Sequence, residues 1–94
     1  MAVRLVVTFK AVSGQGEQFA RAFAPLIAEV KKERGCEQYE LFRSLEAPDT
    51  LVLLERWSDQ AALDAHGVAL RARGPSPTER FRAGPAKVER YEAK

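Results

Sequence analysis

The sequence is poor in the residues that several kinds of site and anchor require. It contains one cysteine and one histidine, so we expect neither an intrachain disulfide nor a zinc site with four protein ligands. Its apolar runs are only a few residues long, whereas about 20 residues are needed to span a bilayer. The N-terminal segment alternates apolar and polar side chains and lacks the long apolar stretch of a secretory signal. With Cys36 unpaired, these absences predict a cytoplasmic protein without a membrane segment.

The charge is not concentrated in one sign. Lys and Arg number 15, Asp and Glu number 13, the formal net charge is +2, and both signs are spread along the chain. Domains that bind nucleic acid usually gather their basic residues in a stripe, so nucleic acid is not an expected partner. A hydrophobic content of 46% in 94 residues excludes a disordered chain and predicts one domain over residues 1–94.

Four segments have the alternation or the β-branched and aromatic content that predicts a β-strand. They are residues 3–10, 36–44, 51–57 and 86–92. In the first segment the apolar side chains on one face are Val3, Leu5, Val7 and Phe9. A turn signal at 47–50 predicts that the second and third segments form a hairpin.

A stripe of apolar residues at helical spacing follows the first strand. Its members are Phe19, Phe23, Leu26, Ile27 and Val30. We expect one helix over about 15–34, with Pro25 kinking it. The last turn would hold the basic residues Lys31, Lys32 and Arg34, which suit the helix dipole. Gly35 would then end the helix.

A second helix is expected after the third strand, with Ser58 as its N-cap and a break at Gly74-Pro75. One face of this helix carries Leu63, His66, Gly67 and Leu70. Beyond the break, Ser76-Pro77-Thr78-Glu79 fits a capping box with Pro at the first helical position. It predicts a short helical turn that carries Phe81.

The resulting order is β-α-β-β-α-β, which predicts an α+β domain of the ferredoxin-like type. In this arrangement a four-stranded antiparallel sheet has both helices on one face. The other face of the sheet carries enough apolar side chains to need a partner. We therefore expect a homodimer that packs through this sheet face.

Several segments of the chain resemble the antibiotic biosynthesis monooxygenase (ABM) domain family. They are Gly35–Ser44, Pro48-Asp49, Leu54–Trp57 and Ala61–His66, within a similarity that covers about Val3–His66 and weakly Pro85–Tyr91. The resemblance implies a dimeric α/β barrel, in which two subunits pack sheet against sheet and each keeps a cavity between sheet and helices. Some members insert oxygen into polycyclic aromatic or quinol substrates without metal or flavin, and a related group degrades haem.

The chain departs from the better-understood members of this superfamily in two ways. It has no asparagine, whereas the anthrone oxygenases and the haem degraders use an asparagine side chain in the pocket. The segment from Gly67 to Pro85 is rich in Arg, Gly and Pro, and it does not match the helix that usually closes the pocket. We therefore rank haem binding or degradation below the other functions.

His66 is the candidate catalytic residue, because a neutral imidazole accepts or relays a proton near neutral pH. A cofactor-independent monooxygenase needs such a base to form the substrate carbanion that reacts with dioxygen. The alternative is a histidine on a helix face that is hydrogen-bonded to a strand backbone or to Glu55.

Four further residues are candidates for substrate binding. They are Trp57, Tyr39, Phe81 and Arg43. The three aromatic side chains would form the wall of an aromatic pocket, and the Tyr39 hydroxyl could hydrogen-bond a quinone-like oxygen. The alternatives are core packing for Trp57 and, for Tyr39, a sheet tyrosine with its tip at the edge of the cavity. Arg43 would either orient an anionic oxygen of the substrate or form an ion pair with Glu55. Cys36 is expected to be a small buried residue, and we expect no cofactor and no metal.

Arginines flank the Gly-Pro loop near the end of the second helix. They are Arg71, Arg73, Arg80 and Arg82. These guanidinium groups would either attract an anionic ligand such as a carboxylate or belong to a solvated loop.

Together with the resemblance, these residues predict a cofactor-independent monooxygenase that acts on a small aromatic or quinol-type molecule. The alternative is a non-catalytic dimeric ligand-binding or accessory module of the same fold. An open apolar pocket on which His66, Trp57 and Tyr39 converge would favour the enzyme, and a closed core would favour the module.

Overall fold

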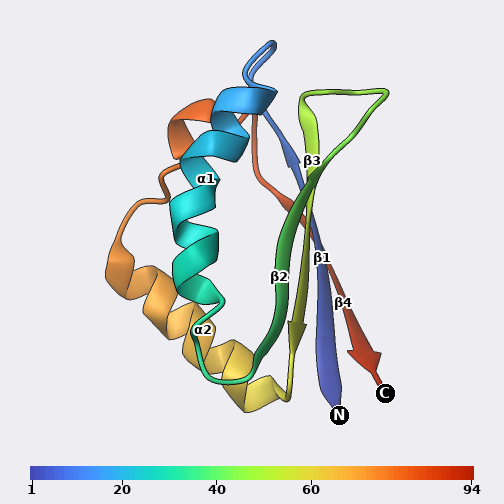
Figure 1. The fold of residues 1–94 in the computed structure, drawn as a ribbon, viewed down its shortest axis with the longest axis vertical. Helices are drawn as coiled ribbons and strands as arrows, with labels where there is room; N and C mark the ends of the chain where they lie inside the picture. Colours follow the sequence, from blue (N-terminus) through green and yellow to red (C-terminus); the bar gives the residue numbers. More distant parts are fainter.

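The computed structural model describes all residues, 1–94, and contains the predicted elements in the predicted order. The elements are β1 (Ala2–Lys10), α1 (Gly16–Val30), β2 (Cys36–Arg43), β3 (Thr50–Trp57), α2 (Gln60–Arg73), the 3-10 turn η1 (Glu79–Phe81) and β4 (Lys87–Ala93). Figure 1 shows both helices on the same side of the sheet. The ferredoxin-like α+β prediction is therefore confirmed. Neither helix is long and apolar enough to cross a membrane.

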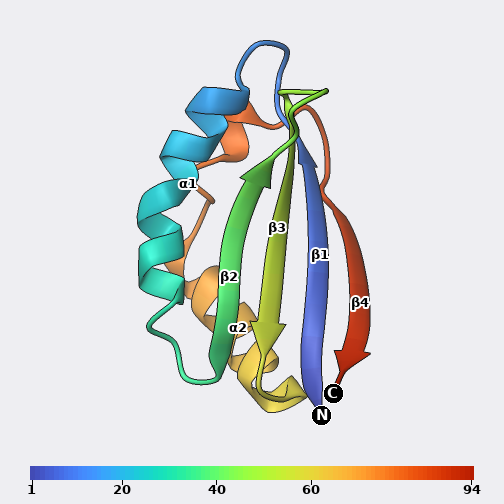
Figure 2. The ribbon, with the colours of Figure 1, turned by 45° about the vertical axis from the view of Figure 1, so that its right-hand side comes forward.

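The four strands form one antiparallel sheet in the order β2-β3-β1-β4 (Figure 2). The register places Leu5 of β1 opposite Glu55 of β3, and Glu55 in turn opposite Tyr39 of β2. Opposite residues of an antiparallel pair point to the same face. Since Tyr39 and Glu55 are both buried, this face is the one that the helices cover.

The core lies between α1 and the sheet, and much of it is aromatic. Val3, Val7 and Phe9 of β1 are buried, as their alternation predicts. The ring of Phe9 lies 5.1 Å from that of Phe19, and Phe23 continues the contacts toward Tyr39, with ring centroids 6.2 Å apart. Edge and tilted ring contacts of this kind add to the free energy gained from apolar burial.

Helix α1 is shorter than predicted. It runs as one helix through Pro25, as expected, but it ends at Val30 and not near residue 34. Its last turn contains no basic residue, because Lys31 is already the C-cap. Gly35 does adopt a positive φ of 82°, which glycine tolerates best, but it closes the turn that follows the helix.

The helix starts also differ from the predicted caps. The N-cap of α2 is Asp59, whose carboxylate accepts from Ala62 N at 2.8 Å, so the prediction of Ser58 was wrong by one residue. The capping box at residues 76–79 is also wrong. Ser76 Oγ accepts from Thr78 N and not from Glu79 N, and only a 3-10 turn follows, with Thr78 as its N-cap.

Candidate functional site

A cavity of about 390 Å³ lies between the helix-covered face of the sheet, α2 and the segment 74–77. Most of its wall is apolar, with side chains that include Leu5, Val7, Phe9, Leu53, Leu63 and Leu70. Its polar side chains are Tyr39, Glu55, His66, Arg73, Ser76 and Arg82. A pocket of this size, apolar with a few convergent polar groups, is typical of a small-molecule site.

His66 lies on the cavity-facing side of α2, where the helical spacing with Leu63, Gly67 and Leu70 had placed it. The side chain is buried, with 3% of the residue exposed. Nδ1 lies 2.9 Å from Glu33 Oε1, and Nε2 lies 4.0 Å from Glu55 Oε1. Because an ionised carboxylate can only accept, Nδ1–H of a neutral imidazole donates to Glu33 in this pair, and Nε2 keeps its lone pair.

The turn after α1 brings Glu33 to His66. Ser58 N donates to the carbonyl oxygen of Gly35 at 2.8 Å, which ties this turn to the start of α2. A side chain at Gly35 would not fit, since a Cβ there would lie 2.5 Å from Ala62 Cβ. The close packing of the turn on α2 therefore holds the Glu33–His66 pair together across 33 residues of sequence.

Trp57 and Glu55 support the imidazole from β3. The Trp57 ring stacks on His66, with centroids 4.5 Å apart and an angle of 29° between the planes. Its Nε1 donates to Glu55 Oε1 at 3.0 Å. Burial raises the pKa of the Glu55 carboxyl, while the hydrogen bond from Trp57 and the charge of His66 act in the opposite direction. Glu55 is thus an acid whose neutral form the fold favours.

Tyr39 presents its ring edge to His66, with ring centroids 5.4 Å apart. Burial raises the pKa of the Tyr39 hydroxyl, and the neighbouring charges of Glu55 and Glu33 raise it further. The hydroxyl therefore stays protonated and lines the cavity as a hydrogen-bond donor.

Only two of the five predicted site residues line the cavity. His66 and Tyr39 line the cavity. Trp57 is fully buried behind His66, and Phe81 is half-buried beside the core, so neither forms part of the cavity wall.

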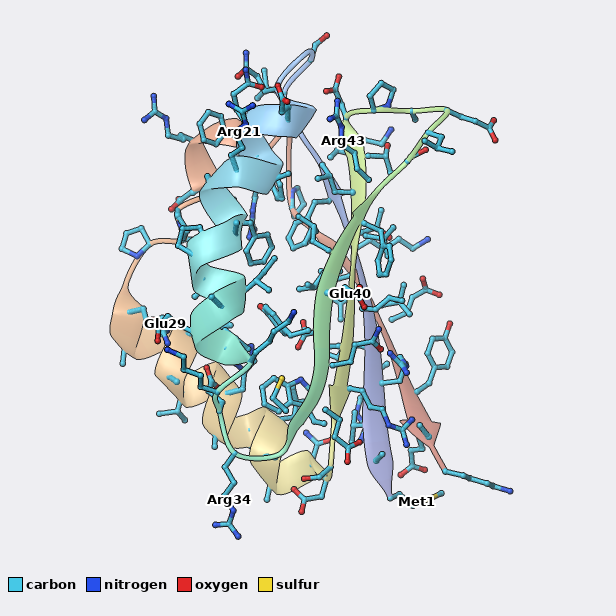
Figure 3. All side chains as sticks on the ribbon, in the orientation of Figure 1. Met1, Arg21, Glu29, Arg34, Glu40 and Arg43 are labelled. Atoms are coloured by element: carbon cyan, nitrogen blue, oxygen red, sulfur yellow. The ribbon has the colours of Figure 1, made fainter.

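Arg43 lies away from the cavity. Figure 3 shows it beside the hairpin that joins β2 and β3, where its Nε donates to the Pro48 carbonyl oxygen at 2.8 Å. The predicted ion pair with Glu55 is wrong, because the register pairs Arg43 with Leu51 and Glu55 with Tyr39. A direct role for Arg43 in this cavity is therefore not supported.

A model of the antibiotic biosynthesis monooxygenase family matches residues 2–68, which is more than half of the chain and includes His66, Glu33, Tyr39, Glu55 and Trp57. The chain belongs to the antibiotic biosynthesis monooxygenase family. The family match ends before the last turns of α2, so Arg73 and the segment that leads to Arg82 lie outside it.

The chain is also similar to one curated protein and to several solved structures. Putative monooxygenase YcnE of Bacillus subtilis is 33% identical over 58 residues, and the chain spans about three fifths of that protein's length (61%). A conserved protein of Methanosarcina mazei superposes with a TM-score of 0.87 at 27% identity, covering 100% of this chain and 94% of its own. A Caulobacter crescentus protein described as a putative antibiotic biosynthesis monooxygenase gives 0.86 at 29%, covering 99% and 90%.

The chemistry available in this ABM cavity is proton transfer next to an apolar binding space. The imidazole of His66 can accept a proton at Nε2, and Glu33 stabilises the resulting positive charge. No group of three or more His, Cys, Asp and Glu side chains is arranged to hold a metal ion. Burial and the charge of Glu33 raise the pKa of the Cys36 thiol, so Cys36 is not an activated nucleophile.

The sequence interpretation missed Glu33, the residue whose carboxylate lies 2.9 Å from His66 Nδ1. It was counted as part of the last turn of a helix, whereas it belongs to the turn that packs on α2. One signal could have found it: it is a lone acidic residue among Lys31, Lys32 and Arg34.

Proposed function

We propose that this ABM family member is a cofactor-independent monooxygenase of small electron-rich aromatic molecules, such as quinols, with His66 as the base. The observation that carries the proposal is the position of His66 on an apolar cavity wall, with Nδ1 held by Glu33 at 2.9 Å. The same arrangement of a carboxylate behind an imidazole fixes the tautomer of a catalytic histidine in other enzymes and stabilises its protonated form.

The reaction converts one quinol and one dioxygen into one hydroxyquinone and one water. His66 Nε2 removes a proton, which makes the aromatic ring electron-rich enough to form a carbon–oxygen bond with dioxygen. The oxygen–oxygen bond of the resulting peroxide then breaks. One oxygen atom stays on the ring, and the other leaves as water with protons from His66 and the ring. The substrate supplies all four electrons, so no external reductant is required.

The wall around His66 suits this chemistry. The protonated hydroxyl of Tyr39 can donate to a substrate oxygen, and the stack with Trp57 limits rotation of the imidazole. Apolar side chains such as Leu5, Leu53 and Leu63 keep bulk water from the reacting carbon.

The working unit is a homodimer formed through the sheet face that no helix covers (Figures 1 and 2). Apolar side chains on this face are Val6, Phe42, Val52, Leu54 and Tyr91. Phe42 is 46% exposed on the edge strand β2 and Tyr91 is 52% exposed on the opposite edge strand β4, so exposed apolar side chains extend across this face in the single chain. Light scattering should give twice the chain mass of 10.5 kDa, and a mass of one chain at micromolar concentration would contradict the dimer.

Oxygen uptake tests the monooxygenase. Purified protein is mixed with a series of hydroquinones and naphthalenediols, and the rate is compared with those of His66→Ala and Val30→Ala. Val30 is fully buried outside the cavity, so Val30→Ala controls for lost packing. We expect His66→Ala to lose roughly 100-fold or more in rate and Val30→Ala to keep most of it.

Two outcomes would contradict the proposal. One is oxygen uptake that is the same in His66→Ala as in the unaltered protein. The other is saturable binding of the aromatic molecules without any uptake of oxygen, which would identify a non-catalytic binding module.

A further inference from the structure

The charged groups on the cavity wall do not balance. Arg73 and Arg82 line it, together with the single carboxylate of Glu55, whose neutral form is favoured by burial. The ion pairs of the chain involve Arg21, Lys32, Arg56 and His66. Neither cavity arginine belongs to any of them, so two guanidinium groups on the wall lack a carboxylate partner.

Arg82 is the more constrained of the two. Its guanidinium carbon lies 5.0 Å from the centre of the Phe9 ring, and its Nε is buried without any hydrogen-bond partner. A buried N–H on a charged group is costly to leave unpaired. The ring face of Phe9 attracts the cation but accepts no in-plane hydrogen bond. Burial of Nε holds the side chain in place, and the terminal nitrogens Nη1 and Nη2, which form no hydrogen bond or ion pair within the chain, are the donors that an anionic oxygen in the cavity would meet.

The two polar ends of the cavity are separated along β1. Leu5 lies opposite Glu55 at the His66 end, and Phe9 lies beneath Arg82 at the other. The step of four residues from Leu5 to Phe9 corresponds to about 13 Å of strand. Arg73 enters the wall from the last turn of α2, and its charge acts on the Tyr39 hydroxyl. Positive charge thus extends from the Arg82 end toward the middle of the cavity.

We propose that the cavity binds a planar aromatic carboxylate, whose acid group pairs with Arg82 and is approached by Arg73 while its ring extends toward His66. The proposal rests on the proposed function only in the role of His66. The wall between the two ends is apolar, which suits a fused-ring skeleton. Guanidinium groups pair with carboxylates in planar, bidentate geometry, so an aromatic carboxylate matches both Arg82 and the apolar wall.

Binding without turnover tests this inference separately from catalysis. The probes are 2-naphthoate and 2-naphthamide, which have the same ring and nearly the same shape but differ in charge. Neither is a quinol, so neither is oxidised by the proposed reaction. Isothermal titration calorimetry at neutral pH and low salt measures both dissociation constants for the unaltered protein and for Arg82→Gln, Arg82→Lys, Arg73→Gln and Arg80→Gln.

The control variant is Arg80→Gln, because Arg80 belongs to the same segment but is exposed and stacks on Phe81 outside the cavity. We expect naphthoate to bind about tenfold more tightly than naphthamide, which is the effect of one charge-assisted hydrogen bond. Arg82→Gln should abolish this preference, Arg82→Lys should keep part of it, and Arg73→Gln should reduce it by a smaller factor. Arg80→Gln should leave it unchanged.

The inference is overturned if the two probes bind equally, if neither binds, or if Arg80→Gln reduces the preference as much as Arg82→Gln. A His66→Ala protein that keeps the preference for naphthoate but consumes no oxygen supports both proposals. Retained preference in a protein that never consumes oxygen removes only the monooxygenase, and oxygen uptake without the preference removes only the carboxylate site.

Discussion

The two ends of the cavity carry different groups. At the His66 end, His66 is paired with Glu33 and Trp57 with Glu55, and all four residues lie within the region that matches the family model. At the Arg82 end, the guanidinium forms no ion pair, lies over the Phe9 ring and is outside that region. Each end holds one buried polar atom without a hydrogen-bond partner, Glu33 Oε2 and Arg82 Nε. Our two proposals assign proton transfer to the first end and binding of a charged group to the second.

The largest effect at the His66 end should come from Glu33→Gln. This change removes the carboxylate that orients the imidazole and stabilises its protonated form, so kcat should fall about 100-fold. KM should change little, because Glu33 is not part of the cavity wall. Steady-state oxygen uptake measures both constants for the variant and for the unaltered protein.

Glu29→Gln is the matched control for this variant. Glu29 lies one turn earlier on α1 and forms an exposed ion pair with Lys32, so the charge change is the same without the contact to His66. An unchanged kcat in Glu33→Gln would show that Glu33 has only a structural role. Binding of naphthoate should be nearly equal in both variants, since the Arg82 end is untouched.

Gly35→Ala should give the next largest effect, on stability as well as on rate. The new Cβ would lie 2.5 Å from Ala62 Cβ, at a backbone φ of 82°, so we expect a loss of about 2 kcal/mol in the free energy of unfolding. Gly14→Ala has nearly the same φ, 80°, with no atom within 4 Å, and should lose about 1 kcal/mol. Urea unfolding of both variants measures the backbone strain, which they share, and the steric conflict, which only Gly35→Ala has. Equal losses in the free energy of unfolding would refute the packing role of Gly35.

The smallest effect should be a gain in stability from Glu55→Gln. Burial raises the pKa of Glu55 in the folded protein, so the unaltered protein loses stability as the pH rises from the unfolded value of about 4.5 toward the folded one. Glutamine carries no such charge and can still accept from Trp57. We therefore expect a gain of about 1 kcal/mol at pH 7 that disappears near pH 4. Urea midpoints at the two pH values measure it, and a gain that is independent of pH would contradict the account.

The helices and strands could be predicted from the sequence because the spacing of apolar residues is a local pattern. The alternation at Val3–Phe9 and the stripe from Phe19 to Val30 fix which faces are buried, and those faces are buried in the structure. The end of α1 could not be read in this way. It depends on the packing of Gly35 against Ala62, a contact between segments that are distant in sequence.

The candidate site was predicted in part for the same reason. His66 and Tyr39 follow from helical and strand spacing, and both line the cavity. Arg43 was misplaced because the pairing of β2 with β3 depends on the register, which the hairpin sets and the composition does not reveal. Glu33 and Arg82 lie in irregular segments, where no period indicates the direction of a side chain.

The central claim is that His66 supplies the base at the end of the cavity opposite Arg82. Chemical rescue tests it most directly: oxygen uptake by His66→Ala is measured with a quinol substrate as the concentration of free imidazole is increased. We predict that oxygen uptake by His66→Ala is nearly absent without imidazole and rises with the concentration of the neutral imidazole base. In a Glu33→Gln, His66→Ala double variant, the rise should be smaller. A His66→Ala protein that consumes oxygen at the unaltered rate without imidazole would contradict the account.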